Sequence, residues 1–278
     1  MSRRGLPQRR SGSLMAHFAL VSVLAALLLA PTASWAQTPE EKGLAIAQET
    51  DRRDLGFLNS EVDLMMVLRN RHGDTSGREL RIQTLEVPEI SDGDKSIVIF
   101  DRPRDIEGTT LLSFTHIAEA DDQWLFLPAL KRVKRISSAN KSGPFIGSEF
   151  AYEDLLSQEV AKYTYRWLRD EPCGDLQCFV MERYPVYENS GYTKQITWVD
   201  QDEYRVMKIE YHDRKDDLLK TLTFVDYQQY LGQYWRAQKL LMNNHQTGKS
   251  TDLLFGKYEF RVPLSEGDFR PGRLKSLR

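Results

Sequence analysis

The densest group of side chains that could do chemistry lies in the sequence LKRVKRI, residues 130–136. Four basic residues surround Val133 there: Lys131, Arg132, Lys134 and Arg135. A local basic cluster attracts phosphates and acidic partners even on a chain of negative net charge. The cluster indicates either a site for anionic headgroups, a site for an acidic partner, or simply a solvated strand face, and the sequence leaves all three open.

The other polar residues do not form a catalytic pattern. Neither G-x-S-x-G nor H-E-x-x-H occurs. The histidines beyond residue 36 are scattered: His72, His116, His212 and His245. Asp200, Asp202 and Glu203 crowd one predicted hairpin without the ligand spacing of a calcium loop, so a solvated turn is the better interpretation. We therefore expect no enzymatic activity, no cofactor and no metal.

The two cysteines lie close together in a turn-like sequence. Cys173 and Cys178 are separated by Gly-Asp-Leu-Gln, which is the wrong spacing for a redox C-x-x-C motif. No histidine stands nearby to complete a metal site. In an oxidising compartment we expect the pair to form a disulfide that contributes about 2 kcal/mol to stability through the entropy of the unfolded chain.

The N-terminus has the pattern of a secretory signal peptide. Four arginines lie among the first ten residues, an apolar run follows over residues 14–30, and Ser-Trp-Ala ends at Ala36 with small residues at the −3 and −1 positions. We predict cleavage after Ala36 and export of residues 37–278. A membrane anchor is the alternative, but the apolar run is short for one. No cysteine near the cut offers a site for lipid attachment.

Net charge and length indicate which partners and how many domains to expect. The signal segment carries four arginines and no acid, so 34 of the 38 basic side chains remain against 40 acidic ones, a net charge of −6. A nucleic-acid-binding protein usually has a basic excess, so we expect no nucleic-acid partner. No repeat, linker or low-complexity segment interrupts residues 37–278, and we predict a single domain.

The pattern beyond the signal segment is mainly that of strands. Residues 39–55 predict a helix, with Pro39 near its start, acids in its first turn and Gly56 after its end. From Glu61 onward, short apolar segments alternate with turn residues at a spacing of roughly 8–12 residues. A short helical segment within residues 148–158 is the exception. The pattern is typical of an antiparallel barrel or sandwich.

Several of these strands are apolar on both faces. Ile97 to Phe100 and Trp124 to Leu127 are examples. A sheet with one wet face alternates more cleanly between apolar and polar residues. We therefore expect the sheet to be covered on one face and to curl around something on the other, which is either packed side chains or a cavity.

A motif around the basic cluster adds a resemblance. A Trp-x-x-x-Pro stretch leads through Arg-Ile and a Ser/Gly loop to Gly-Ser-x-Phe-x-Tyr-x-Asp-Leu, carried by Trp124, Pro128, Arg135, Ile136, Gly147, Ser148, Phe150, Tyr152, Asp154 and Leu155. This motif resembles the LolA-like family of outer-membrane lipoprotein-sorting proteins. Further stretches that look similar are RPRDIEGTTLL at 102–112, residues 192–222, TGKSTDLLF at 247–255 and FRPGRL at 269–274.

The resemblance implies a fold, a compartment and a function. The expected fold is mainly β, an incomplete antiparallel β-barrel with an apolar concave face and short covering helices. Members are periplasmic, and the implied function is to carry a lipid or the acyl chains of a lipoprotein and hand them on. An RND-type exporter is a plausible partner, and we expect a monomer. The alternative on the same scaffold is a non-enzymatic envelope sensor or binding module.

The resemblance also assigns candidate roles to residues. The candidates for lining a lipid cavity are Val98, Phe100, Leu112, Phe114, Trp124, Phe126, Leu130 and Trp198. The basic cluster is the candidate headgroup or partner site. The candidate mobile covers are the 39–55 helix and the 137–158 loop, whose motif residues are Gly147, Ser148, Phe150, Tyr152 and Asp154. Asp154 could instead cap a helix or pair with Arg135.

Overall fold

The computed structural model describes residues 37–87, 92–117 and 119–277. Residues 38–278 form one compact unit. The predicted signal peptide and its cleavage site at Ala36 lie outside the described residues. Within the described part of the chain, no helix is long and apolar enough to span a membrane.

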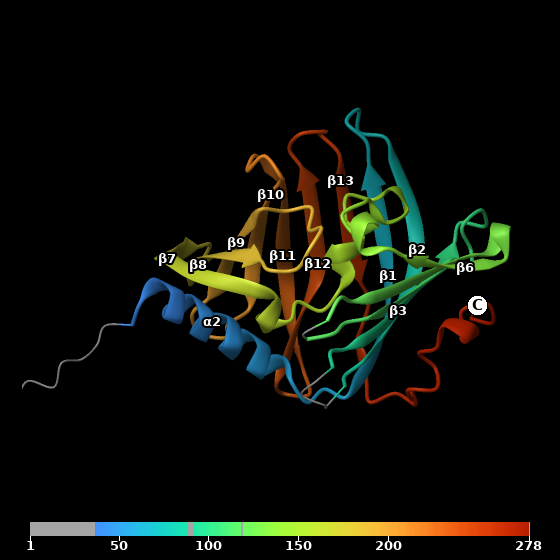
Figure 1. Cartoon of the computed structure of the whole chain (residues 1–278), viewed down its shortest axis with the longest axis horizontal. Coiled ribbons are helices and arrows are strands. Elements are labelled where there is room, and N and C mark those ends of the chain that lie inside the picture. Colours follow the sequence, from blue (N-terminus) through green and yellow to red (C-terminus); the bar gives the residue numbers. More distant parts are fainter. Residues whose placement is uncertain (1–36, 88–91, 118, 278) are drawn as a thin grey trace, which may run out of the picture. The chain divides into compact units, whose positions relative to one another are not determined.

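One antiparallel sheet makes up most of the unit. Its strands are β1 (Asn59–Arg69), β2 (Thr75–Leu85), β3 (Lys95–Arg102), β4 (Thr110–Phe114), β5 (Asp122–Leu127), β6 (Arg132–Ile136), β7 (Tyr163–Cys173), β8 (Leu176–Pro185), β9 (Lys194–Asp200), β10 (Val206–His212), β11 (Leu218–Tyr230), β12 (Tyr234–Asn244), β13 (Ser250–Phe255) and β14 (Glu259–Phe260). The strand order is β6-β5-β4-β3-β2-β1-β13-β12-β11-β10-β9-β8-β7, and β14 pairs with β1. The sheet curls but β6 does not pair with β7, so the prediction of an incomplete antiparallel barrel is confirmed (Figure 1).

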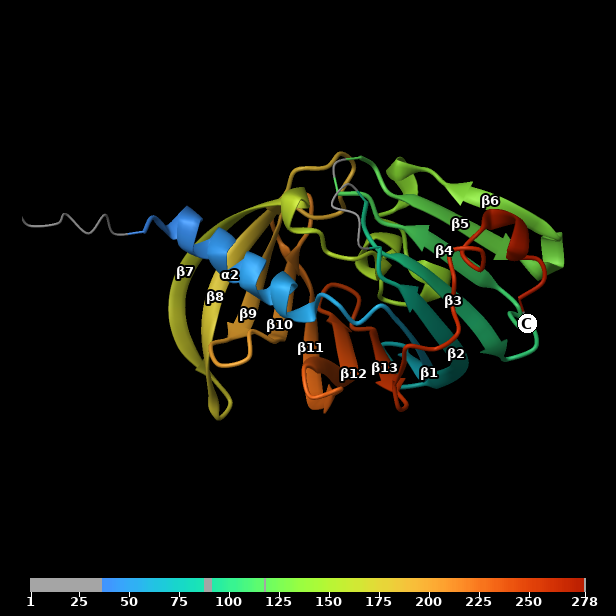
Figure 2. The ribbon, with the colours of Figure 1, turned by 90° about the horizontal axis from the view of Figure 1, so that it is seen from below.

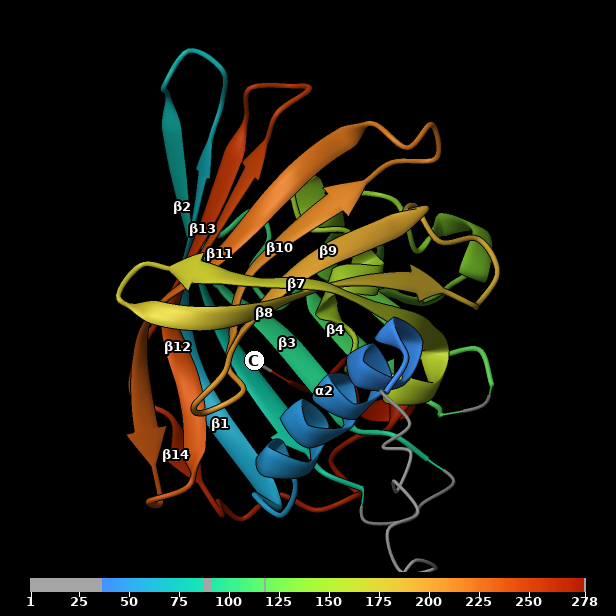
Figure 3. The ribbon, with the colours of Figure 1, turned by 90° about the vertical axis from the view of Figure 1, so that its left-hand side faces the viewer.

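The helix α2 (Pro39–Asp54) lies across the open side of the curled sheet (Figure 2 and Figure 3). A capping box starts it: Thr38 Oγ1 accepts a hydrogen bond from Glu41 N at 3.2 Å, and Thr38 N donates to Glu41 Oε2 at 2.8 Å. Its buried residues are Gly43, Ile46 and Ala47. A Cβ on Gly43 would lie 2.8 Å from the backbone nitrogen of Trp167 in β7, so only glycine allows the helix to approach this strand so closely.

The inner face of the sheet is the face that carries α2. Ile46 and Ala47 pack there against Tyr165, Met181 and Val199 of β7 to β9. The strand register continues this face across Met181, Thr197, Ile209, Leu222 and Met242, residues that pair in sequence from β8 to β12. The larger core cluster follows on the same face and reaches Val98, Phe100 and Leu111 on the far arm of the sheet.

A second chain segment fills the inner face beside the larger cluster. This inner segment, residues 138–162, carries the 3-10 turns η2 (Ser138–Asn140), η3 (Phe145–Gly147), η4 (Tyr152–Leu155) and η5 (Val160–Lys162). Phe145 and Phe150 are fully buried against the residues of the larger core cluster. The predicted hollow is therefore occupied at this end by the protein's own side chains. Figure 1 shows the path of the inner segment beside the curled sheet.

The outer face of β3 to β5 is covered by the C-terminal segment, residues 261–277. Ile97, Ile99 and Leu112 alternate with the inward residues and pack against Phe269 and Leu274. The turn η6 (Pro271–Arg273) lies within this segment, and the turn η1 (Pro128–Leu130) joins β5 to β6. These strands are apolar on both faces because the inner segment covers one face and the C-terminal segment the other.

We expect this cover to be a main source of stability. Leu274→Ala removes a fully buried side chain and should lower the free energy of unfolding by about 3 kcal/mol. The control is Leu130→Ala, an exposed leucine whose loss should cost less than about 0.5 kcal/mol. Urea unfolding of both variants measures the difference. Equal small losses would show that the C-terminal segment does not form part of the core.

Candidate functional site

A polar row crosses the inner face between its apolar regions. Arg183, Gln195, Tyr211 and Lys220 pair in sequence across β8, β9, β10 and β11. All four are buried. Arg183 Nε donates to Gln195 Oε1 at 2.6 Å, and the guanidinium lies 4.8 Å from the ring centre of Tyr163. Polar groups in such a row are costly to bury without partners.

The Lys220 end of the row is fully paired. Lys220 Nζ donates to Asp154 Oδ2 at 2.6 Å and to the carbonyl of Glu149 at 2.9 Å. Asp154 also accepts hydrogen bonds from Ala151 N at 2.6 Å and from the Tyr192 hydroxyl at 2.7 Å. A buried ion pair is tolerated when further hydrogen bonds satisfy its oxygens, as they do here. The pair fastens the inner segment to β11.

Two further residues, Glu153 and Ser148, stabilise the inner segment through hydrogen bonds. Glu153 is buried and accepts from Gly191 N at 2.8 Å, from the Ser190 hydroxyl at 3.0 Å and from the Tyr187 hydroxyl at 3.1 Å. Burial raises the pKa of Glu153, and these three hydrogen bonds oppose that rise. Ser148 Oγ donates to the carbonyl of Phe145 at 2.7 Å. This dense network makes the segment part of the wall.

Besides its three buried residues, the helix α2 is held by polar and cation–π contacts. Lys42 Nζ lies 3.6 Å from the ring centre of Trp167, and Arg53 lies 4.6 Å from that of Tyr204. Arg53 also donates to the carbonyl of Asp202 at 2.9 Å. At the end of the helix, Asp54 pairs with Arg236. Exposed contacts of this kind are individually weak, so α2 is better suited than the inner segment to serve as a movable cover.

A cleft of about 530 Å³ opens beneath the last turns of α2. Its floor is the inner face, including Val206, Phe224 and Tyr227 of β10 and β11. Arg205 crosses the cleft wall, 4.6 Å from the ring centre of Trp235, and is paired with Asp200 at 2.7 Å. The cleft therefore has an aromatic and cationic wall and reaches the inner face at Val206 and Phe224.

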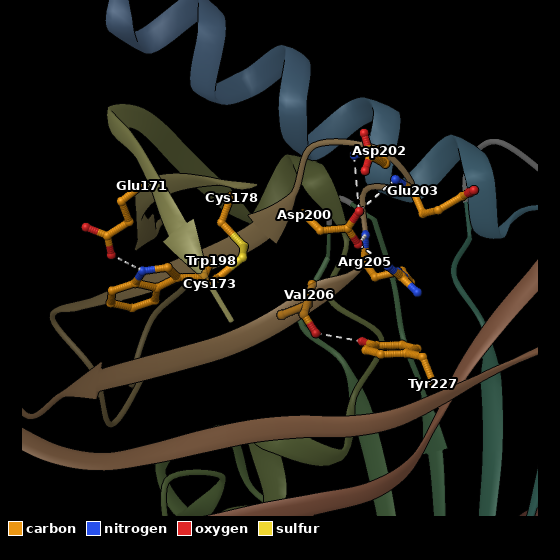
Figure 4. Close-up of a disulfide and its surroundings, with 10 residues drawn as sticks. All are labelled: Glu171, Cys173, Cys178, Trp198, Asp200, Asp202, Glu203, Arg205, Val206 and Tyr227. Atoms are coloured by element: carbon orange, nitrogen blue, oxygen red, sulfur yellow. Dashed lines mark hydrogen bonds and ion pairs between the residues drawn. A yellow bond between two sulfur atoms is a disulfide. The ribbon is translucent and has the colours of Figure 1, made fainter. Parts of the chain in front are cut away.

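Asp200 is the residue that shapes this wall. It is fully buried and accepts from the backbone nitrogens of Glu203 at 2.7 Å and Arg205 at 3.0 Å (Figure 4). The interpretation of this acidic group as a solvated turn is therefore wrong for Asp200, whose carboxylate organises the β9–β10 turn. Among the described residues, no group of three or more His, Cys, Asp or Glu side chains is placed to hold a metal.

Comparison with known proteins agrees with this architecture. A family model described as "Uncharacterized protein" matches residues 92–276. A domain from Vibrio parahaemolyticus, named as an outer membrane lipoprotein-sorting protein domain, is 54% identical, with a TM-score of 0.83, and the match covers 85% of this chain and 99% of that one. The chain belongs to the LolA-like family of lipoprotein-sorting proteins.

More distant structures share the fold. A DUF1329 family protein from Desulfovibrio piger is 27% identical with a TM-score of 0.80, and the match covers 85% of this chain and 99% of that one. A LolA superfamily protein from Nitrosomonas europaea is 21% identical with a TM-score of 0.65, covering 82% and 97% of the two chains. No curated protein sequence matches the chain significantly.

The structure divides the predicted cavity residues of this LolA-like protein between two faces. Val98 and Phe100 lie on the inner face, in the larger core cluster. The residues that pack on the outer face under the C-terminal segment are Leu112, Phe114, Trp124 and Phe126. Leu130 is exposed in η1. Trp198 also lies on the outer side, where its indole donates to Glu171 Oε1 at 2.5 Å (Figure 4).

The other predicted residues are placed as follows. Cys173 and Cys178 form a disulfide at the tip of the β7–β8 hairpin (Figure 4). Lys131, Arg132 and Lys134 are exposed in and next to β6, while Arg135 pairs with Asp122. Asp154 thus caps the turn η4 and pairs with Lys220, and it does not pair with Arg135.

Sequence reasoning missed the polar row. Phe179, Met181 and Arg183 alternate along β8, and the period of two places all three on one face. That alternation was the available signal for a buried arginine. The same alternation places Gln195 and Thr197 together on one face of β9. That this face is the inner one can be predicted only after the position of α2 is known.

The Asp154–Lys220 pair gives a direct test of the wall. Asp154→Asn leaves the buried ammonium of Lys220 without a counter-charge and should cost about 3–5 kcal/mol of unfolding free energy. Arg135→Met, which removes an exposed ion pair, should cost less than about 1 kcal/mol. Adding Lys220→Met to Asp154→Asn should recover part of the loss. Denaturant unfolding that shows equal effects for the two single variants would contradict this assignment.

The half-buried acid Asp94 predicts a pH dependence. Burial raises the pKa of Asp94 to about 7, with Glu159, Glu86 and Asp54 adding to the rise. An unfolded aspartate titrates near about 3.9, so the folded state binds this proton more tightly. The contribution of Asp94 to stability is therefore greatest at low pH and is lost as the pH rises toward about 7.

The variant Asp94→Asn isolates this contribution. Between pH 5 and pH 7, its unfolding free energy should change less than that of the wild type, because an amide does not titrate. Thermal unfolding across this pH range measures both curves. Parallel curves for the two proteins would show that Asp94 does not titrate in the folded state over this range.

Proposed function

We propose that this LolA-like protein is a non-enzymatic periplasmic carrier that binds a lipid, or the acyl chains of a lipoprotein, on the inner face of its sheet. The observation that carries the proposal is the open cleft beneath α2, which leads onto the apolar inner face. The similarity to a domain named for lipoprotein sorting supports it.

The energetics of the cover fit a carrier. Each methylene removed from water gains about 0.8 kcal/mol, so a sixteen-carbon chain gains about 12 kcal/mol when fully buried. The contacts that hold α2 are three buried residues and several exposed polar pairs. Exposed pairs contribute about 0–1 kcal/mol each. An acyl chain can therefore displace the helix, and the helix can close again after the chain leaves.

The proposal includes a partner. The family resemblance points to an RND-type exporter, and the exposed basic residues Lys131, Arg132 and Lys134 offer a surface for an acidic partner or for lipid headgroups. Co-purification of the exporter with the tagged protein from solubilised envelopes tests this part. A carrier that binds lipid but recovers no exporter would retain the first part of the proposal and lose the second.

Bound lipid is the principal test. We expect protein isolated from its own envelope to carry lipid that native mass spectrometry detects and organic solvent extracts. The delipidated protein should then bind a neutral fluorescent probe such as N-phenyl-1-naphthylamine. Lipid-free native protein together with no probe binding would contradict a carrier function.

The fit of α2 against β7 tests the role of the cover. Gly43→Val places side-chain atoms where the backbone of β7 lies, so it should displace the helix and speed release of the bound probe by at least about tenfold. Ala45→Val creates the same side chain at an exposed position of the same helix and should leave the rate unchanged. Stopped-flow fluorescence measures both. Equal rates would show that α2 does not control access.

A further inference from the structure

Arg183 stands apart from the other buried cations. The described residues contain four of them: Lys141, Lys162, Arg183 and Lys220. Lys141 and Lys162 pair with Asp121, and Lys220 pairs with Asp154. Arg183 is 8% exposed, and among the described residues no carboxylate lies within 4 Å of it. A buried charge is costly unless something neutralises it, so a missing anion is the feature that requires explanation.

The hydrogen bonds around Arg183 leave one side of it open. The Arg183 Nε donates a hydrogen bond to Gln195 Oε1, and this bond fixes the plane of the guanidinium group. Within the described part of the chain, its two Nη atoms have no hydrogen-bond acceptor. These two atoms together present a pair of donors that matches the two oxygens of a carboxylate.

Neighbouring groups point to the same missing ligand. Thr197 is 1% exposed, and its Oγ1 has no hydrogen-bond partner in the described residues. It lies diagonally from Arg183 on the adjacent strand, a position about 7 Å away in an antiparallel sheet. Tyr211 pairs with Gln195 on the same face and is also buried, with its ring centre 4.8 Å from that of Tyr192. Arg183, Thr197 and Tyr211 therefore lie on three consecutive strands of one face, and no hydrogen bond joins any two of them in the described residues.

We infer that Arg183, Thr197 and Tyr211 form an interior receptor for the carboxylate of a single-chain fatty acid, with the hydrocarbon lying on the apolar inner face toward α2. This inference rests on the proposed carrier function and specifies its ligand. The single positive charge of Arg183 balances a single negative charge. Met181, Val199 and Ile209 lie on the same face beyond the polar row and are buried in the ligand-free protein, so the hydrocarbon would contact them after α2 moves aside.

The arrangement favours entry with the carboxylate leading. The cleft beneath α2 reaches the inner face at Val206, and the polar row lies further along β10 at Tyr211. The arginines at the cleft already have acidic partners: Arg205 pairs with Asp200, and Arg236 pairs with Asp54. Arg183 is therefore the unpaired cation that a charged end would meet inside.

Matched ligands test the inference. Displacement of N-phenyl-1-naphthylamine measures the affinities of palmitate and of hexadecanol, which has the same chain without the charge. We expect wild-type protein to prefer palmitate by at least about tenfold, since a hydrogen-bonded charge contributes this much. Arg183→Met should abolish the preference while retaining hexadecanol binding. Arg102→Met, which removes an exposed arginine, should leave the preference unchanged.

Thr197→Val provides a second variant that does not depend on removing a charge. It deletes an unsatisfied buried hydroxyl and keeps the side-chain shape, so the ligand-free protein should unfold at the same or a higher temperature. Palmitate affinity should nevertheless fall by about threefold or more, with hexadecanol affinity unchanged. A structural role for the hydroxyl would instead lower the unfolding temperature and leave palmitate binding intact.

The outcomes separate the inference from the carrier proposal. Binding of neither ligand contradicts the carrier itself. Equal binding of palmitate and hexadecanol by the wild type overturns the carboxylate receptor and leaves the carrier standing. Lysophosphatidylglycerol with the same chain length serves as the third ligand. If its affinity depends on Arg183 and that of palmitate does not, the receptor recognises a phosphate and the assignment to a fatty-acid carboxylate is overturned.

Discussion

A sheet whose strands are apolar on both faces has to be covered on both faces, and the rest of this structure depends on that constraint. Ile97 and Ile99 face outward on β3, while Val98 and Phe100 face inward. The outward set is covered by Phe269 and Leu274 from the other end of the chain, and the inward set by Phe145 and Phe150 of the inner segment. The sheet can remain open at both edges because its faces, rather than a closed barrel, exclude water.

The two covers of the inner face differ in how they are attached. The inner segment is fastened by buried charges and hydrogen bonds, including Asp154 to Lys220 and Glu153 to Gly191. The helix α2 is attached by three buried residues, Gly43, Ile46 and Ala47, and by contacts that reach solvent. We therefore expect the end of the inner face under the inner segment to be rigid and the end under α2 to be mobile, because local opening occurs where the contacts are weaker. The unsatisfied polar groups lie next to the weaker cover.

Local sequence signals predicted most of the fold. Alternation and turn residues predicted the strands, and Pro39 with its following acids predicted α2 to within one residue. The open curled sheet came from the motif that ends at Leu155, through the resemblance to the LolA-like family. The face on which each residue lies was harder. Leu112 and Phe126 look like cavity residues until the C-terminal segment is seen to cover them, and that contact joins distant parts of the chain.

The candidate site was the least predictable part because it too is formed by residues that lie far apart in the sequence. Lys220 lies 66 residues from Asp154 in sequence, and no local pattern links them. Arg183 looks like a surface arginine between Glu182 and Tyr184 until parity and the position of α2 place it inside. The basic cluster at residues 131–135, by contrast, is conspicuous in the sequence, and part of it is used in an ordinary surface ion pair between Arg135 and Asp122.

The central claim is that the inner face beneath α2 holds an acyl chain. Photolabelling with a diazirine-bearing fatty acid, followed by peptide mapping, tests it most directly. The account predicts that labels concentrate on inward residues of β8 to β10, such as Met181, Val199 and Ile209. Labels found only on the outer face, around Trp124 or the C-terminal segment, would contradict it.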